Sequence, residues 1–406
     1  MTHNLFVAVA ADGLQHTMIV VRQGTNAFDT TLAVLAALTL PSLRGRRVLV
    51  KPNVGRAVAP GLGITTHPQV VAAVLEFVKK HGPARLVVGE SPIIGVKAIE
   101  AMEVAGIASV AREKGVELLD LDDGPPHEVA VPDGKILRSV KLTSRWSEFD
   151  FVISVPVMKT HMHTRVSLSL KNMKGVLWRR EKVRFHQLRA PETGFSDATP
   201  LDVAIADLST VAAPDLAVID GIIGHEGMGP SAGTPRPVGL VVAGTDYLAA
   251  DAVAARLMGF EPHAIAHLRL AAANASRALD TEEIEVDPAD YGRYAVRFTP
   301  PPEDIAIEFP NVEVSDRESC SACLSTVAVF LKRYYGELAE MLGPERKLYI
   351  AIGKGEHEPR GVTVCVGNCT EKFKDQGVYV QGCPPVASDI YVRVHDFLSE
   401  RPGGKR

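Results

Sequence analysis

The sequence predicts an α/β protein with a largely parallel sheet covered by helices, Rossmann-like and in one or two lobes, followed by a smaller cysteine-bearing α+β region. Three observations predict this fold class. Short β-branched runs alternate with helical segments over about the first 260 residues. The runs are almost continuously apolar, as strands buried on both faces are. All five cysteines lie after residue 319.

The length and composition indicate a globular protein with more than one folding unit. The chain has 406 residues, of which 46% are hydrophobic and 23% charged, and this length exceeds the usual size of one core. We expect an α/β domain over 1–275, an irregular connection rich in Asp, Glu and Pro over 276–318, and a metal-binding or cluster-binding region over 319–406.

The charge and the N-terminus exclude two classes of partner. A net charge of −4 and a pI near 6.4 give no global attraction to nucleic acid or anionic membranes. The first residues lack the pattern of a signal peptide, and no stretch approaches 18 uninterrupted apolar residues. We therefore expect a cytoplasmic protein with a small-molecule substrate, and a homo-oligomer is compatible with the sequence.

Five apolar runs predict the strands of the main sheet, at 46–50, 85–88, 151–155, 216–219 and 240–243. An amphipathic helix follows Pro68, with a capping threonine before it and Gly82 after its end. Residues 129–142, which the turn sequence Pro-Asp-Gly interrupts, predict a hairpin. Asp246 is expected to cap a helix over 248–257.

The C-terminal quarter shows weaker but similar patterns. Helical periodicity over 325–342 follows the first cysteine pair, and strand-like runs follow at 348–352 and 362–366. The segment 389–398 is expected to be helical.

Polar residues that directly follow the predicted strands are the candidate site residues, because ligands of open parallel sheets bind outside the carboxyl ends of the strands. The densest group lies in 156–165, where Lys159 and His161 are the predicted catalytic residues, and its cations suit phosphate, carboxylate or an oxyanion. The predicted substrate-binding residues are Lys51, Asn53, Glu90, Lys171, Asn172 and Asp220.

The glycine-rich loop over 220–230 resembles a phosphate-binding loop only loosely, and it is equally compatible with a turn between two strands. His225 and Glu226 within it are predicted as an acid/base pair. The dinucleotide fingerprint is missing, which disfavours hydride transfer from a nicotinamide.

The spacing of the cysteines favours one [4Fe-4S] cluster over zinc. Cys320 and Cys323 form a C-x-x-C pair, Cys365 and Cys369 are four apart, and Cys383 precedes two prolines. Structural zinc ribbons usually have two C-x-x-C pairs, whereas a Cys-Pro step ends a common cluster-binding run. We predict Cys320, Cys323, Cys369 and Cys383 as the ligands. Cys365 lies in an apolar run and is the expected spare.

Several motifs, in order over about residues 45 to 270, resemble the family called domain of unknown function 362. They are Lys51-Pro52-Asn53, Gly89-Glu90-Ser91, the 156–161 run, the 169–175 stretch, Asp220-Gly221, and Gly244-Thr245-Asp246 with Asp251. The resemblance implies a bacterial or archaeal cytoplasmic protein, of a kind often joined to ferredoxin-like modules. The cysteines here depart from the two-cluster ferredoxin run.

These expectations combine into an iron–sulfur oxidoreductase that passes electrons from one cluster to a small anionic substrate, with an electron-donor protein as a further partner. Two alternatives stay open. A cluster with an open iron position acts as a Lewis acid in a lyase or isomerase. A non-catalytic metal or cluster carrier, or a maturation protein, would instead present an apolar docking patch.

Overall fold

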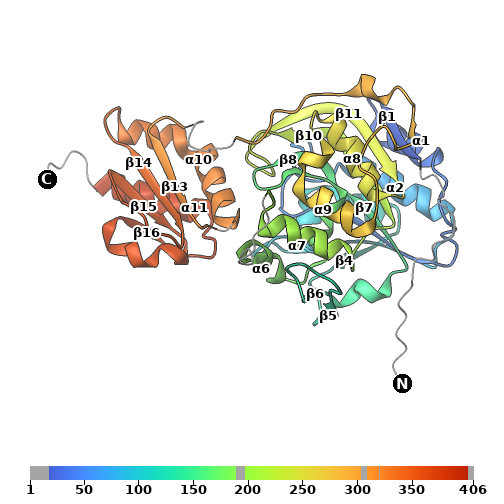
Figure 1. Ribbon diagram of the computed structural model, residues 1–406, viewed down its shortest axis with the longest axis horizontal. Helices are drawn as coiled ribbons and strands as arrows, with labels where there is room; N and C mark the ends of the chain where they lie inside the picture. Colours follow the sequence, from blue (N-terminus) through green and yellow to red (C-terminus); the bar gives the residue numbers. More distant parts are fainter. Residues whose placement is uncertain (1–17, 189–196, 303–308, 320, 401–406) are drawn as a thin grey trace.

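The computed structural model describes residues 18–188, 197–302, 309–319 and 321–400. Cys320, one of the predicted ligands, lies outside these residues. The described chain forms a larger unit around a ten-stranded sheet and a smaller C-terminal unit around a four-stranded sheet, and the two units lie side by side (Figure 1).

The main sheet confirms the predicted α/β class. Its strand order is β12-β1-β11-β10-β7-β2-β3-β4, and β8 pairs with β10 and β9. The strands are β1 (Ile19–Gln23), β2 (Arg47–Pro52), β3 (Arg85–Glu90), β4 (Glu117–Asp120), β7 (Phe151–Val155), β8 (Val157–His161), β9 (Arg165–Ser167), β10 (Leu216–Glu226), β11 (Thr234–Gly244) and β12 (Val286–Asp287).

The centre of this sheet is parallel and one side of it is antiparallel. Neighbours from β10 through β7, β2 and β3 to β4 run parallel. The long strands β10 and β11 form an antiparallel pair, and β1 also runs antiparallel to β11. The two apolar runs predicted here are therefore only parts of two eleven-residue strands, at the start of β10 and near the end of β11.

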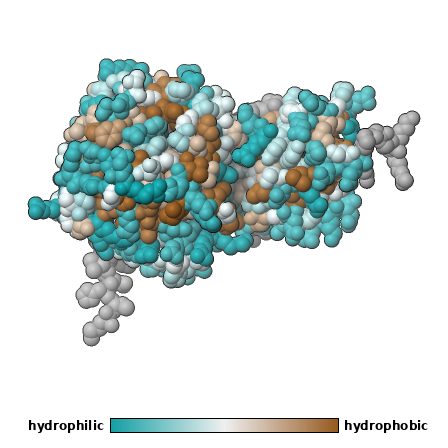
Figure 2. Space-filling model, turned by 180° about the vertical axis from the view of Figure 1, so that it is seen from behind, coloured by the Kyte–Doolittle hydropathy of each residue, from teal (hydrophilic) through white to brown (hydrophobic). Residues whose placement is uncertain are grey.

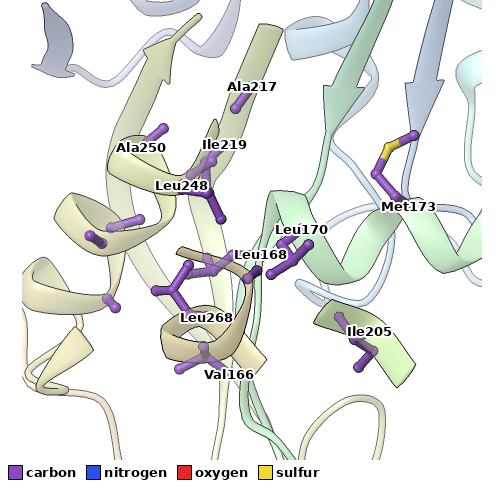
Figure 3. Packing of buried hydrophobic residues seen from close by; sticks show 14 of the residues in the cluster. Val166, Leu168, Leu170, Met173, Ile205, Ala217, Ile219, Leu248, Ala250 and Leu268 are labelled. Atoms are coloured by element: carbon purple, nitrogen blue, oxygen red, sulfur yellow. The ribbon is translucent and has the colours of Figure 1, made fainter. Parts of the chain in front are cut away.

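Helices cover both faces of the main sheet, because successive strand residues point to opposite faces. Val48 and Val50 pack with one helical layer, and Leu49 between them packs with the other. The first layer is α1 (Ala27–Ala36), α2 (Pro68–Lys80), α3 (Ala98–Val104) and α4 (Ile107–Glu113). The second is α5 (Ser169–Asn172), α6 (Glu181–Gln187), α7 (Pro200–Ser209), α8 (Tyr247–Leu257) and α9 (Ala266–Ala275). Figure 3 shows part of its core, where Leu170 of α5 and Leu248 of α8 lie near Ile219 of β10.

Two local predictions in the larger unit have different outcomes. The hairpin is present as β5 (Pro126–Ala130) and β6 (Ser139–Thr143), which pair antiparallel. The cap of α2 is His67 and not a threonine, because the His67 ring accepts a hydrogen bond from the backbone N–H of Gln69. Thr66 instead donates to the backbone carbonyl of Val155 in β7.

The C-terminal sheet is parallel throughout, in the order β13 (Val312–Arg317), β14 (Leu348–Gly353), β15 (Val362–Val366) and β16 (Val378–Val380). Helices α10 (Ser321–Leu342) and α11 (Ala387–Glu400) pack on one face. The 3-10 helix η6 (Asn368–Gln376) covers the other through Phe373. This unit is therefore α/β and not the expected α+β. Because the sequence of η6 is polar, the crossover that it makes between β15 and β16 was not predicted.

The stretch 276–318 is less irregular than expected. Its first part packs on the larger unit, where β12 pairs with β1 and Phe298 joins the core. Its last part is β13, an edge strand of the C-terminal sheet. Three of the six residues of β13 are charged, so it lacks the continuous apolar run that identified the other strands.

The two units share apolar contacts at their junction. Met228 and Ala232, from the loop between β10 and β11, are buried in one cluster with Val327 and Phe330 of α10. Figure 2 shows hydrophobic residues on one face of the larger unit that continue toward this junction. Across the described residues, no helix combines the length and apolar character needed to span a membrane.

Candidate functional site: a cationic cleft beside a cysteine-bearing edge

The order of the main sheet favours a ligand site, here called the cationic cleft, at the ends of β2 and β7. The chain leaves β2 toward β3 and β4 on one side and returns through β7 on the other. At such a reversal the loops after the two strands separate, and ligands bind in the crevice between them. Lys51 and Glu90 end β2 and β3 at this edge.

Three predicted substrate-binding residues, Lys51, Glu90 and Asn172, are joined by hydrogen bonds below the cleft. The Lys51 ammonium is only 1% exposed, and it donates to Glu90 Oε2 at 3.0 Å and to Asn172 Oδ1 at 3.1 Å. Glu90 also accepts from the backbone N–H groups of Val54 and Ser91. Burial lowers the pKa of Lys51, and the Glu90 charge opposes that shift. Because every partner is supplied by the protein, this cluster supports the floor of the cleft.

The 169–175 stretch ends in a glycine, Gly175, because this position has no room for a side chain. A Cβ atom at this position would lie 2.4 Å from both Glu90 Oε1 and Lys51 Nζ. Such a contact is far inside van der Waals distance, so a side chain here would displace the buried ion pair.

Lys159 extends from β8 into the same cleft. Its ammonium is buried and donates to Asn53 Oδ1 and to the backbone carbonyl of Ile64 at 2.9 Å. Burial, and to a smaller extent the nearby charge of Arg56, lower the pKa of Lys159 to about 7. Both partners of Lys159 are neutral, so its positive charge has no direct counterion among the described residues.

A second group of cations lies on α5 and directly after it. The Lys174 ammonium lies 2.9 Å from Nε2 of His186 in α6, and burial and then Lys182 lower the pKa of Lys174 to about 7. Lys171 is held well below its usual pKa by burial and by the charges of Lys174 and Lys159.

His161 adjoins this group, with its ring centroid 5.6 Å from that of His163. Burial and the charge of Lys171 hold the pKa of His161 far below its ordinary value, so the ring is neutral. Its Nδ1 accepts from the backbone N–H of His163, and a neutral imidazole that accepts at Nδ1 carries its proton on Nε2. His161 is therefore a hydrogen-bond donor through Nε2.

Two buried carboxylates position the segments around the cleft. The carboxylate of Asp251 accepts from the backbone N–H groups of Ser169 and Leu170 at 2.7 and 2.8 Å, and so fixes the start of α5. Asp220, predicted to bind substrate, accepts from the N–H of His67 at the start of α2. Burial raises the pKa of Asp251 to about 7 and that of Asp220 to about 6.

The predicted acid/base pair, His225 and Glu226, forms hydrogen bonds with backbone groups of the protein. His225 Nδ1 lies 2.9 Å from the carbonyl of Leu62, and its Nε2 accepts from the N–H of Gly233. Glu226 accepts from the N–H of Thr299 and lies near Arg236. Burial lowers the pKa of His225 to about 4. With both ring nitrogens bound to the backbone, His225 is suited to hold the loop and not to transfer protons.

The cysteines lie at the carboxyl edge of the C-terminal sheet. Cys323 is in the first turn of α10 after β13, Cys369 follows β15, and Cys383 follows β16. The described residues alone hold no group of three metal-binding side chains, and Cys320 lies outside them. Thiolates gathered at one edge nevertheless suit a soft metal or a cluster.

Two contacts define this edge further. A Cβ on Gly367, whose φ is +93°, would lie 3.2 Å from Cys323 Sγ, so the glycine lets the chain before Cys369 pass close to that thiol. The amide of Gln187, at the end of α6, donates to Cys383 Sγ at 3.3 Å. Since the preceding residue is His186, α6 connects the cysteine-bearing edge to the cationic cleft.

Cys365 lies on the opposite face of the C-terminal sheet from Cys323. Its side chain is fully buried on the face covered by η6, with Tyr349 and Phe373. Burial raises the pKa of its thiol to about 11. That Cys365 is not a ligand stays a prediction, and this position is compatible with it.

The comparison with protein families identifies the larger unit. The model of a domain of unknown function, DUF362, matches residues 48–256, about half of the chain. The chain belongs to the DUF362 family. The match includes the cleft residues from Lys51 to Asp251 and ends before the cysteines, so the cysteine-bearing edge lies outside the DUF362 region.

A curated relative of this DUF362 chain is a thylakoid-associated protein of Synechocystis, 31% identical over 221 residues. The match covers 54% of this chain and 65% of that protein, somewhat less than two thirds of its length. Among solved structures, the lactate racemase apoprotein of Thermoanaerobacterium thermosaccharolyticum is 9% identical, with 94% and 80% of the chains covered and a TM-score of 0.43. A Thermotoga maritima protein is 14% identical, with 63% and 61% covered and a TM-score of 0.36.

Sequence reasoning about the DUF362 region missed several cations of the cleft. Lys174 was visible in the 169–175 stretch, but its role depends on α6, which brings His186 to it. Arg56 follows β2 and belonged to the strand-end pattern. Lys182 showed no signal, because it reaches the cleft from a helix and not from a strand end.

Proposed function

We propose that this protein is an iron–sulfur oxidoreductase that binds a small organic anion in the cationic cleft. The observation that carries the proposal is the set of three ammonium groups of Lys159, which is buried, and of Lys171 and Lys174, which are partly buried. Among the described residues, no carboxylate lies within ion-pair distance of any of them. Buried charges are normally paired, so an anionic ligand is the expected partner.

The protein's own residues divide the work in this proposal. Lys159, Lys171 and Lys174 bind the anion with charge-assisted hydrogen bonds. An anion beside these groups raises their pKa values, so binding is accompanied by proton uptake on lysine. His161 holds a proton at Nε2 for the bound compound, and Asp251 positions Lys171 through α5. Asn53 and the carbonyl of Ile64 keep Lys159 directed into the cleft.

Cys320, Cys323, Cys369 and Cys383 would hold the [4Fe-4S] cluster. When bound, the cluster supplies or accepts one electron at a time. The described thiols support this assignment because they lie in the segments that follow three strands, at one edge of the sheet. Gly367 also gives Cys323 room beside the loop after β15. The contact between Gln187 and Cys383 supports proximity between this edge and the cleft.

The cluster is tested by anaerobic purification with iron, sulfide and zinc analysis and an absorbance spectrum. We expect about four iron and four sulfide per chain. Cys369→Ser and Cys383→Ser should lose most of the iron, whereas the matched control Cys365→Ser should retain it. A colourless protein with one zinc per chain would overturn the redox proposal, and iron loss in Cys365→Ser alone would overturn the ligand assignment.

The anion cleft is tested separately by calorimetric titration with sodium sulfate at low ionic strength. Lys171→Met should weaken sulfate binding at least tenfold, because it removes a partly buried cation without changing the cysteines. Lys135→Met, an exposed change on the hairpin loop, controls for net charge. Unchanged sulfate affinity in Lys171→Met would show that the cleft is not the anion site.

A further inference from the structure

The thiol of Cys383 receives a hydrogen bond from the other unit of the protein. The side-chain amide of Gln187 donates to Cys383 Sγ at 3.3 Å. Gln187 ends α6, which lies on the side of the larger unit that faces the C-terminal unit (Figure 1). Cys383 follows β16 of that C-terminal unit. The larger unit thus supplies an N–H donor to one of the predicted cluster ligands.

The donor is held in place although the Gln187 side chain is exposed. Phe185 of the same helix is 1% exposed and belongs to the core of the larger unit. The Lys182 ammonium donates to the Ser91 hydroxyl and lies 3.4 Å from Asp122 Oδ1. Because these contacts anchor α6 to the larger unit, the last residue of the helix presents its amide in a defined position.

The acceptor is fixed as well. Asn368 and Gly382 come directly before Cys369 and Cys383 in the sequence. The backbone N–H of Asn368 donates to the carbonyl of Gly382 at 2.9 Å, and the N–H of Gly382 donates to Asn368 Oδ1 at 2.8 Å. These two bonds tie the loops after β15 and β16 together. The thiol that Gln187 contacts therefore belongs to a pair of joined loops that contains two of the predicted ligands.

We propose that Gln187 sets the reduction potential of the [4Fe-4S] cluster as a hydrogen-bond donor outside its ligand set. This inference rests on the proposed function, because it requires a cluster for which Cys383 is a ligand. Reduction adds one negative charge to the cluster and its sulfur atoms, so an N–H donor stabilises the reduced form more than the oxidised form. The donor therefore raises the potential.

The assignment gives the DUF362 region a direct influence on a cluster that the C-terminal unit holds. Gln187 follows His186, whose Nε2 lies 2.9 Å from the Lys174 ammonium of the proposed anion site. One short helix thus contacts both the anion site and a cluster ligand. A C-terminal unit that separated from the larger unit would lose this donor, and its cluster would be harder to reduce.

The test compares the cluster potential of wild-type protein with that of three full-chain variants, by stepwise anaerobic reduction with dithionite and absorbance. Gln187→Met keeps the length of the side chain and removes its N–H donor, so the ratio of reduced to oxidised cluster at a fixed potential should fall about fivefold. Gln187→Lys keeps a donor and adds a positive charge, so this ratio should rise. Gln376→Met, the same change at an exposed position of η6, is the control and should leave the ratio unchanged.

Iron and sulfide analysis of each protein separates this inference from the proposed function. Wild-type protein without an iron–sulfur cluster would overturn both. An intact cluster with the same potential in Gln187→Met as in wild-type protein would overturn only the role of Gln187. If Gln187→Met loses iron, Gln187→Lys decides, because it retains an N–H donor: a raised potential supports the proposal and an unchanged potential overturns it. Loss of iron from both variants would also overturn it, since Gln187 would then retain the cluster and not set its potential.

Discussion

The lysines of the cleft combine burial with mutual repulsion, and this combination makes ligand binding sensitive to pH. Lys159 and Lys174 each have a pKa of about 7, lowered first by burial. An unfolded lysine has a pKa near 10.4. These two side chains therefore change charge in the range where most enzymes work.

We predict that sulfate affinity falls as the pH rises through 7, because only the charged lysines attract the anion. Between pH 6 and pH 8 the loss should be about tenfold for each lysine that must be charged. Sulfate keeps its charge over this range, so calorimetric titrations at pH 6, 7 and 8 report on the protein. An affinity that does not change with pH would contradict the charge state inferred for the cleft.

The same lysines make the free energy of unfolding increase with pH, whereas they make the affinity for sulfate decrease. Between pH 7 and about 10.4 the unfolded chain binds more protons at these positions than the folded one, so their contribution to the free energy of unfolding increases with pH. Denaturation measured without ligand at a series of pH values should show this increase in wild-type protein. The increase should be smaller in Lys174→Met.

Single residues were predicted unevenly, for a physical reason. Lys51, Lys159 and Lys171 follow strand ends or occur in a motif, so their position in the chain indicated the cleft. Their different roles did not follow, because whether a cation is paired depends on contacts such as Lys51 with Glu90. His225 looked catalytic in the sequence, but its backbone partners come from residues 62 and 233.

At the scale of elements, α8 organises the cleft through side chains at its start. Asp246 caps α8 through one oxygen, which accepts from the N–H groups of Leu248 and Ala249. Asp251, one turn further, uses both of its oxygens on the start of α5. The first carboxylate serves its own helix and the second serves a neighbouring one.

Asp251→Asn should destabilise the protein by about 1–3 kcal/mol, since an amide keeps only one acceptor for the two N–H groups of α5. It should also weaken sulfate binding, because Lys171 lies on α5. Asp246→Asn is the matched control, and its single capping oxygen is retained, so its change should stay within a few tenths of a kcal/mol. Urea unfolding measures both variants, and equal losses would contradict the positioning role of Asp251.

The strands with continuous apolar runs were predictable, because burial on both faces leaves a direct signal in the sequence. The first four runs correspond to β2, β3, β7 and β10. The short strands β9 and β12 and the edge strand β13 were not predictable. They bury few side chains, and partners far along the chain define them.

At the scale of the whole molecule, the contact between the units brings the cysteine-bearing edge toward the cleft. Apolar packing of Met228 with α10 and the hydrogen bond from Gln187 to Cys383 both cross the junction. This docking had no signature in the sequence, because Met228 and Gln187 lie in segments that the pattern analysis assigned to a loop or left unassigned.

Met228→Asp should weaken the docking, because it places a charge where the native side chain is 2% exposed. We expect calorimetry to resolve two thermal transitions where wild-type protein shows more closely coupled unfolding. Val392→Asp, at a position on α11 that is 50% exposed, should leave the transitions unchanged. Unchanged unfolding in Met228→Asp would indicate that the junction contributes little to stability.

The position of Cys365 also has a practical consequence for chemical labelling. With a pKa of about 11, only about one thiol in a thousand is a thiolate at pH 8, so alkylating reagents should modify it slowly. In a mass-spectrometric footprint, the cysteines at the sheet edge would become reactive on treatment with a chelator if they hold the proposed metal. Modification of Cys365 would instead report unfolding of its sheet, so one peptide map distinguishes demetallation from denaturation.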